Sequence, residues 1–331
     1  MITGSSNSLL FLAWYLPLVP FLFEGMAVLK SAVKVRPYIQ LLRVHHWIKN
    51  ILVFIALFFS ANLLDPSVIN AAILGFICFS VLSSIVYILN DIRDTEKDRQ
   101  HNTKCRRPLA SGKISLRGAI IALVVLFALL AFLLIALWVY GKRVHYIEAV
   151  GLLALYMLLN IAYSWGLKNI PIIDVTILAS GYVIRVLFGA LVIGITISVW
   201  LYLVITLGAY YLGLGKRRNE ISGNEKENRE VMRFYSHNFL DKNMYVCKTL
   251  CVVFYALWSV DSATIERFHT SAFVYTIPLV LIILFKYSLN IETDSDGDPT
   301  SVLLSDKILL LLCAIYVICA FFIIYLNKAE A

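Results

Sequence analysis

A row of oxygen-bearing side chains lies where a long apolar segment of this chain ends. At about 100° per residue, side chains four positions apart drift only about 40° around a helix, so Asn90, Asp94 and Asp98 share one face and Asp91 lies near the same arc. Such hard oxygen ligands suit Mg²⁺, which completes its coordination with water and substrate phosphates. The row therefore predicts a magnesium site that binds a diphosphate. The alternative is a solvated acidic cap on a membrane helix, which would account for one or two of the acids.

A basic cluster follows the acidic row and consists of Lys104, Arg106 and Arg107. Arginine presents a planar fork that can bind two phosphate oxygens at once. Together with a metal ion, these cations would clamp a phosphorylated ligand. The alternative is that they serve only to orient the chain in a membrane.

The elements that position these residues are membrane helices. Hydrophobic residues make up 60% of the 331 residues and charged residues only 15%, whereas a soluble domain is about 45–50% apolar. We therefore expect an all-α, multi-pass membrane protein with about nine spans, each long enough to cross about 30 Å of hydrocarbon. The apolar runs that give this number are 49–64, 68–89, 116–140, 146–165, 173–193, 198–214, 245–260, 271–286 and 308–326.

The basic residues predict how the chain is oriented. Lys and Arg collect in cytoplasmic loops, and most of them fall on the side that carries the acidic row and the polar segments 215–243 and 287–307. We expect these segments to face the cytoplasm from the inner membrane of the cell. The net charge of +8 follows mostly from this topology and does not indicate nucleic acid as a partner. Residues 1–37 form an extension that could add an apolar helix, and 38–331 form one catalytic domain.

Further cations lie at the predicted cytoplasmic ends of spans or inside them. Lys216, Arg217 and Arg218 follow the sixth span and could bind phosphate or only anchor the helix. Arg185 lies within the fifth span, where a charge is costly without a partner or a water-filled cavity; it could contact phosphate or pair with a carboxylate such as Asp174. Lys168 closes the fourth span and could hold a phosphate or extend to the membrane surface.

These motifs resemble those of a known family. Asn90-Asp91-x-x-Asp94-x-x-x-Asp98, followed by Arg107-Pro108-x-x-Ser111-Gly112, is similar to the first Asp-rich motif of the UbiA superfamily of intramembrane prenyltransferases. The resemblance covers about residues 38–326 and implies nine helices around a central cavity. The segment that contains Lys49 and Asn50 resembles the decaprenyl-phosphate phosphoribosyltransferase branch of this superfamily.

One departure from the wider superfamily is informative. Members that modify aromatic rings carry a second Asp-rich motif after the sixth span, but here Gly215-Lys216-Arg217-Arg218-Asn219-Glu220 is cationic and resembles the Lys-Arg-Arg loop of the phosphoribosyltransferase branch. The resemblance implies transfer of 5-phosphoribose from phosphoribosyl diphosphate to a polyprenyl phosphate, with Mg²⁺, for cell-envelope precursors. It gives catalytic roles to Asp94, Asp98, Lys216 and Arg217, and substrate-binding roles to Lys49, Asn50, Lys104, Arg106, Arg107, Lys168, Arg185 and Arg218.

Two other functions remain open at this point. A UbiA-type prenyltransferase would use an allylic diphosphate and an aromatic acceptor, and the missing second Asp-rich motif argues against it. A transporter would place charges near the membrane midplane on broken helices, whereas here only Arg185 lies deep. The acids at 294–306 do not fit a calcium loop, and we expect them either to cap the last helix or to take part in chemistry. The oligomeric state is not predicted.

Overall fold

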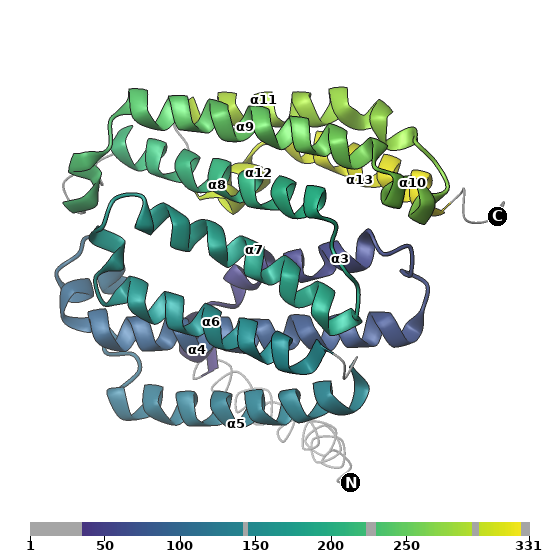
Figure 1. Ribbon diagram of the computed structural model, residues 1–331. Coiled ribbons are helices and arrows are strands. Elements are labelled where there is room, and N and C mark those ends of the chain that lie inside the picture. Colours follow the sequence, from purple (N-terminus) through teal and green to yellow (C-terminus); the bar gives the residue numbers. More distant parts are fainter. Residues whose placement is uncertain (1–34, 142–144, 223–229, 293–297, 326–331) are drawn as a thin grey trace, which may run out of the picture. The chain divides into compact units, whose positions relative to one another are not determined.

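The computed structural model describes residues 35–141, 145–222, 230–292 and 298–325. These residues form helices and short 3-10 turns and contain no strand (Figure 1), which confirms the all-α prediction. They fall into two compact units. One unit contains the described residues up to Val44 together with Tyr87–Val124, and the other contains His45–Val86 and the residues from Val125 onward.

Eight helices in the described part of the chain are long and apolar enough to cross a membrane, or nine if one bent pair counts as a single span. This agrees with the prediction of about nine spans. The eight are α4 (Pro66–Arg99), α5 (Leu116–Tyr140), α6 (Tyr146–Ser164), α7 (Ile173–Ile193), α8 (Val199–Ser222), α9 (His237–Val260), α11 (Ile277–Glu292) with the preceding turn η7 (Ala272–Thr276), and α13 (Lys307–Tyr325).

Short elements connect the long helices. They are η1 (Val44–Phe54), α3 (Ile55–Phe58), η2 (Lys104–Arg106), η4 (Leu167–Asn169), η6 (Glu230–Phe234), α10 (Ser262–Phe268) and α12 (Pro299–Ser305). The extension predicted for residues 1–37 lies almost wholly outside the described residues, so it stays a prediction.

The first predicted span is not one continuous α-helix. The chain forms a helix over Val35–Leu42, turns at Arg43 in a left-handed conformation with φ 50°, and continues through η1 and α3. The span predicted over 49–64 therefore corresponds to the second part of a bent pair, Val44–Phe58, which begins and ends earlier than the apolar run. Polar contacts explain the difference, because Asn50 lies among the apolar residues of η1 and its side-chain amide donates to hydroxyls of α4.

Helix α4 supplies the acidic row. Pro66 occupies its first turn, where a missing N–H costs nothing, and the carboxylate of Asp65 accepts the backbone N–H of Ser67 at 2.8 Å. The helix has 34 residues, so at 1.5 Å per residue it is about 50 Å long, more than a bilayer core requires. The acidic row thus lies on the last turns of a helix that continues beyond its apolar run.

Two other helices extend further than the apolar pattern predicts. α8 continues to Ser222, so the cationic residues at 216–218 lie on a helix and not in a loop. α9 begins at His237, not at residue 245, and the hydroxyl of Ser236 caps it by accepting the N–H of Phe239. Figure 1 shows α8 and α9 packed side by side. Ion pairs made by the charged residues let both helices continue past their apolar segments.

A close approach of two backbones holds η1 against α7. A Cβ atom at Gly189 of α7 would lie 2.0 Å from the carbonyl oxygen of Val53 in η1. Any side chain at this position would push the two segments apart. Glycine here therefore fixes where η1, and with it Lys49 and Asn50, lies on α7.

We expect Gly189→Ala to lower the stability of the protein. Forcing a methyl group into a well-packed contact costs about 1–3 kcal/mol, so the midpoint of thermal unfolding in detergent should fall. The matched control is Gly151→Ala in α6, where a Cβ would meet no atom within 4 Å and alanine is the better helix former. Equal unfolding midpoints for the two variants would show that the contact between η1 and α7 is not tight.

Candidate active site

The acidic cluster consists of Asn90, Asp91, Asp94 and Asp98 on the last turns of α4. The helical spacing predicted from the sequence is confirmed, since α4 runs through residue 99. Asp91 and Asp98 are buried, and Asn90 and Asp94 are half-buried. Burying carboxylates requires compensating charge, and nearby arginines supply it.

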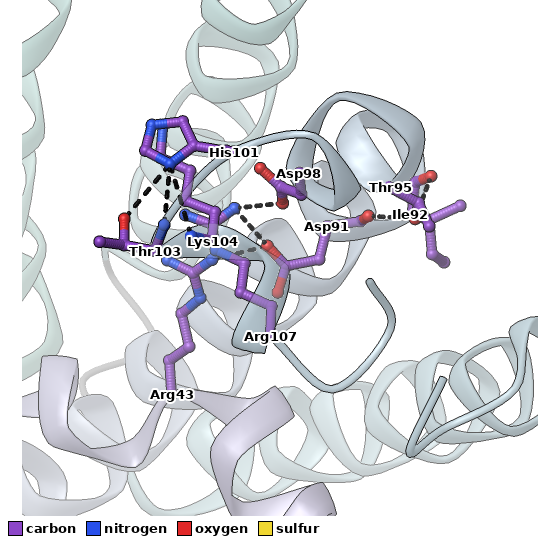
Figure 2. A network of polar contacts seen from close by, with 9 residues as sticks. All are labelled: Arg43, Asp91, Ile92, Thr95, Asp98, His101, Thr103, Lys104 and Arg107. Atoms are coloured by element: carbon purple, nitrogen blue, oxygen red, sulfur yellow. Dashed lines mark hydrogen bonds and ion pairs between the residues drawn. The ribbon is translucent and has the colours of Figure 1, made fainter. Parts of the chain in front are cut away.

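Two arginines bind the acidic cluster, as Figure 2 shows. The Nη1 atom of Arg107 lies 2.6 Å from Asp98 Oδ2 and 3.2 Å from Asp91 Oδ1. The Nη2 atom of Arg43 lies 2.6 Å from the same Asp91 oxygen, and its guanidinium lies over the ring of Tyr87. Arg107 thus joins two carboxylates seven positions apart on α4. Arg43 was not among the predicted site residues, and no sequence spacing relates it to Asp91.

The other two predicted cations of this segment lie in and beside η2. Lys104 is half-buried and Arg106 is exposed. The ring nitrogen Nδ1 of His101 accepts the backbone N–H of Thr103 at 3.3 Å and shapes the start of this turn (Figure 2). Arg107 therefore makes the ion pairs to the acidic row, and roles of Lys104 and Arg106 in substrate binding stay predictions.

The donor set can be compared with what magnesium requires. No group of three His, Cys, Asp or Glu side chains in the described ranges is arranged to hold a metal ion. Asp91 and Asp98 nevertheless converge on one cationic nitrogen, that of Arg107. Carboxylate and amide oxygens are the ligands that Mg²⁺ prefers, and it needs only one or two of them from the protein. The chemistry of the acidic cluster therefore fits this ion.

A second cluster brings together Lys49 of η1, Lys216 of α8 and Asp298 at the start of α12; we call it the lysine cluster. The ammonium of Lys49 lies 2.7 Å from Asp298 Oδ1, and that of Lys216 lies 3.8 Å from the same oxygen. All three side chains are partly exposed, between 15% and 27%. The lysine cluster thus carries a net charge of +1 and can still be reached by a ligand.

Asp298 remains ionised at neutral pH. Burial alone would raise its pKa, but Lys49, a hydrogen bond from Thr300 and Lys216 together hold the pKa down at about 2. The residue precedes Pro299 at the N-terminus of α12, yet its side chain caps no backbone N–H. The expected capping role belongs instead to Asp306, whose carboxylate accepts the N–H groups of Ile308 and Leu309. The predicted acids at 294 and 296 lie outside the described residues.

Arg217 has a different environment from the one expected. Consecutive residues of a helix point about 100° apart, so Arg217 faces away from Lys216 and is fully buried. Its Nε donates to Asp174 at 2.7 Å, its Nη1 pairs with Glu220, and its Nη2 donates to the Tyr163 hydroxyl at 3.0 Å. This enclosure does not favour the predicted catalytic contact between Arg217 and a substrate.

The Asp174 carboxylate has a second donor. The hydroxyl of Tyr235, which follows η6, donates to Asp174 and accepts the backbone N–H of Ile172. Burial raises the pKa of Tyr235, and the hydrogen bond to Asp174 adds to this effect. We call Arg217 and the acids and tyrosines around it the Arg217 network. This network joins the ends of α6, α7 and α8 next to the lysine cluster. The spacing of its acids and tyrosines along the sequence did not predict that they meet.

Arg185 and Asn50 bind each other. Arg185 Nε donates to Asn50 Oδ1 at 2.8 Å, and its other nitrogens donate to the Tyr156 hydroxyl at 3.1 Å and to the carbonyl of Gly181. The amide of Asn50 in turn donates to the hydroxyls of Ser80 and Ser83. The predicted alternative, a pair between Arg185 and Asp174, is wrong, because Asp174 binds Arg217. These contacts favour a positioning role for Arg185 and Asn50 over direct binding of substrate.

The last two predicted cations, Arg218 and Lys168, are not members of the lysine cluster. Arg218 pairs with Asp241 of α9 at 2.6 Å. Lys168 lies in η4 and is half-buried. Substrate binding by these two residues stays a prediction.

Comparison with known proteins identifies related chains. Residues 50–312 match the model described as the UbiA prenyltransferase family. A decaprenyl-phosphate phosphoribosyltransferase from Corynebacterium glutamicum is 31% identical, over 87% of this chain and 86% of its own length. A protein of the same name from Mycolicibacterium smegmatis is 30% identical, over 83% and 88%.

Solved structures share the fold. A UbiA homolog from Archaeoglobus fulgidus bound to DMAPP and Mg²⁺ superimposes with a TM-score of 0.65 and 19% identity, over 87% of this chain and 98% of that one. The same homolog bound to GPP and Mg²⁺ gives a TM-score of 0.62 over 87% and 99%. At this identity the likeness concerns the arrangement of helices.

Proposed function

Since this chain belongs to the UbiA prenyltransferase family, we propose that it is a polyprenyl-phosphate phosphoribosyltransferase. It would transfer 5-phosphoribose from phosphoribosyl diphosphate to a polyprenyl phosphate and release diphosphate. The observation that carries this proposal is the lysine cluster, because its Lys216 follows the sixth span, where ring-modifying members of the superfamily have a second acidic motif. The names of the relatives from Corynebacterium and Mycolicibacterium support a polyprenyl-phosphate acceptor and the transfer of a phosphoribosyl group.

The acidic cluster would bind the diphosphate of the donor. Asn90, Asp91, Asp94 and Asp98 would hold Mg²⁺, which neutralises the charge that develops on a departing diphosphate. Arg107 and Arg43 already lie against these carboxylates and would add donors for phosphate oxygens. The presence of Mg²⁺ in structures of the fold, as in the Archaeoglobus homolog, supports a metal here.

The acceptor needs little activation. As diphosphate leaves, positive character builds at C1 of the ribose, and an oxygen of the lipid phosphate forms the new bond there. This oxygen is already ionised at neutral pH, so the reaction needs no strong general base; correct placement supplies much of the rate. The lysine cluster would place a phosphate group electrostatically.

Buried networks would hold the lysines in position. The Arg217 network fixes α8, which carries Lys216, and the contact between Arg185 and Asn50 fixes η1, which carries Lys49. Arg217 and Arg185 would thus act as positioning residues. This positioning role replaces the direct contact with phosphate that the sequence alone favoured for both arginines.

The setting of the reaction is part of the proposal. The chain is a multi-pass membrane protein, and we propose that it lies in the inner membrane with both clusters facing the cytoplasm, where soluble sugar phosphates are made. The isoprenoid tail of the acceptor would lie among apolar helices, and the product would serve as a precursor of cell-envelope glycolipids or polysaccharides.

A direct assay tests the proposed reaction. Purified protein in detergent receives radiolabelled phosphoribosyl diphosphate and a polyprenyl phosphate with Mg²⁺, with EDTA as control and a parallel assay that offers an allylic diphosphate. We expect metal-dependent label in the lipid phase. Label only from the allylic donor would make the protein an ordinary prenyltransferase, and label from neither donor would favour a transporter.

We expect Lys216→Ala to raise the KM for phosphoribosyl diphosphate more than it lowers kcat. A hydrogen bond to a charged group contributes about 1.5–3 kcal/mol, which corresponds to at least tenfold in KM. The measurement is a steady-state titration of the donor at saturating acceptor. The control is Lys242→Ala, which removes an exposed lysine of α9. A similar rise in KM in both variants would show that the effect comes from the loss of any positive charge and not from a contact made by Lys216.

A further inference from the structure

Helix α11 carries a buried hydroxyl with no hydrogen-bond partner in the described part of the chain. Tyr287 is only 5% exposed, and its hydroxyl makes no hydrogen bond to any of the described residues. Its neighbour Tyr211, whose ring centroid lies 5.4 Å away, is instead satisfied through the Leu284 carbonyl and the Ser288 hydroxyl. A buried polar group left unpaired destabilises a fold, and in native proteins it usually marks a site for water, an ion or a ligand.

The ring of Tyr287 lies near the end of α8 that carries Lys216. It packs against Tyr211, which lies one helical turn before Gly215 on α8. Helices α8 and α11 approach closely at Gly215, where a Cβ would lie 2.4 Å from the side chain of Ile291. Gly215 directly precedes Lys216, and Ile291 lies one helical turn beyond Tyr287. The close approach therefore brings the hydroxyl and the lysine to the same end of the two helices.

The chemistry of this group of residues selects a particular ligand. Two ammonium groups, those of Lys49 and Lys216, bind anionic oxygens. The carboxylate of Asp298 lies between them and can only accept hydrogen bonds, so it would repel a bare phosphate or diphosphate. The phenol of Tyr287 can donate a hydrogen bond to a hydroxyl group of a ligand, and the carboxylate of Asp298 can accept one from such a group. A ligand with both phosphate and hydroxyl groups satisfies all four side chains.

We propose that Tyr287 and Asp298 bind hydroxyl groups of the donor's sugar while Lys49 and Lys216 bind its phosphate. The proposal rests on the proposed function and adds to it the residues that recognise the sugar. Tyr287 thereby becomes a specificity residue, and its hydroxyl is satisfied only when a sugar phosphate is bound.

Binding measurements with two probes test this assignment. Ribose 5-phosphate and inorganic phosphate are each titrated calorimetrically into purified full-length protein in detergent. Wild type should bind ribose 5-phosphate more tightly than phosphate. Tyr287→Phe should weaken ribose 5-phosphate about tenfold, the effect of one lost hydrogen bond, and leave phosphate unchanged. Equal weakening of both probes, weakening of neither, or no preference in the wild type would overturn the proposal.

Tyr211→Phe is the matched control. It removes a hydroxyl from the ring that packs against Tyr287, but that hydroxyl is bonded within the protein. We expect Tyr211→Phe to lower the unfolding midpoint and to retain the preference for ribose 5-phosphate, whereas Tyr287→Phe should keep the wild-type midpoint. A fall in the midpoint of Tyr287→Phe as large as that of Tyr211→Phe would place its hydroxyl in an internal bond and contradict the assignment.

The outcomes separate this proposal from the proposed reaction. Selective weakening in Tyr287→Phe, combined with no transfer from phosphoribosyl diphosphate by the wild type, would keep the sugar-phosphate subsite and reject the reaction. Transfer by Tyr287→Phe with an unchanged KM for phosphoribosyl diphosphate would keep the reaction and reject the subsite.

Discussion

Asp94→Asn should lower the turnover of phosphoribosyl diphosphate by about 10²–10³-fold, the cost of removing one charge-stabilising group from an active site. Asparagine has nearly the same shape as aspartate but carries no charge, so it binds Mg²⁺ more weakly. The substitution leaves in place the ion pairs that Arg107 and Arg43 make with Asp91 and Asp98. The fold should therefore survive, and the unfolding midpoint should match that of the wild type.

The measurement is kcat in the radiolabel assay as a function of Mg²⁺ concentration. Asp94→Asn should need more Mg²⁺ for half-maximal rate. The control is Glu96→Gln on the same helical turn, whose side chain is 81% exposed and pairs with Arg99; it should keep full activity. Wild-type turnover by Asp94→Asn would remove the proposed metal site.

Arg217→Ala should destabilise the protein by about 3–5 kcal/mol, the cost of leaving buried charges without their partner. Asp174, Glu220 and the hydroxyl of Tyr163 all face Arg217, so alanine would leave two buried carboxylates without their guanidinium partner. Thermal unfolding in detergent measures the effect. Arg217→Lys should rescue it only in part, because an ammonium cannot reproduce the planar fork that reaches three partners.

The neighbouring Arg218 provides the control. Its ion pair with Asp241 joins two side chains that are both partly exposed. Such pairs contribute about 0–1 kcal/mol, so Arg218→Ala should unfold close to the wild type. Equal destabilisation by the two substitutions would show that the burial of Arg217 does not matter, and would return that residue to the candidates for substrate contact.

Part of the candidate site could be predicted from the sequence because it depends on local geometry. The acidic cluster lies on one helix, and the period of a helix alone places residues 90, 94 and 98 on one face. Lys216 was found because the segment after the sixth span is cationic where ring-modifying members of the superfamily carry an Asp-rich motif. Lys49 came from resemblance to a family branch, and no spacing connects it to Lys216.

The remaining contacts could not be predicted because they join residues distant in the chain. Asp298 lies 249 positions from Lys49, and the polar pattern near it is equally consistent with a helix cap. The sequence predicted the same role for Arg217 as for Lys216, because adjacent cations differ only in the direction in which they point from the helix. Which direction leads to an accessible site depends on where the neighbouring helices lie. The unpaired hydroxyl of Tyr287 is invisible in the sequence for the same reason.

The sequence by itself determined the membrane class, the helical fold, the family and the acidic row, because apolar length, composition and helical period are local properties. The tertiary structure alone decided which charges remain accessible and which are enclosed. Lys49, Lys216 and Asp298 meet at a partly exposed position, whereas Arg217 and Arg185 are surrounded by acids, amides and tyrosines. The physical reason is that an ionised side chain buried among apolar helices needs a partner, and only the packing of those helices determines which partner it has.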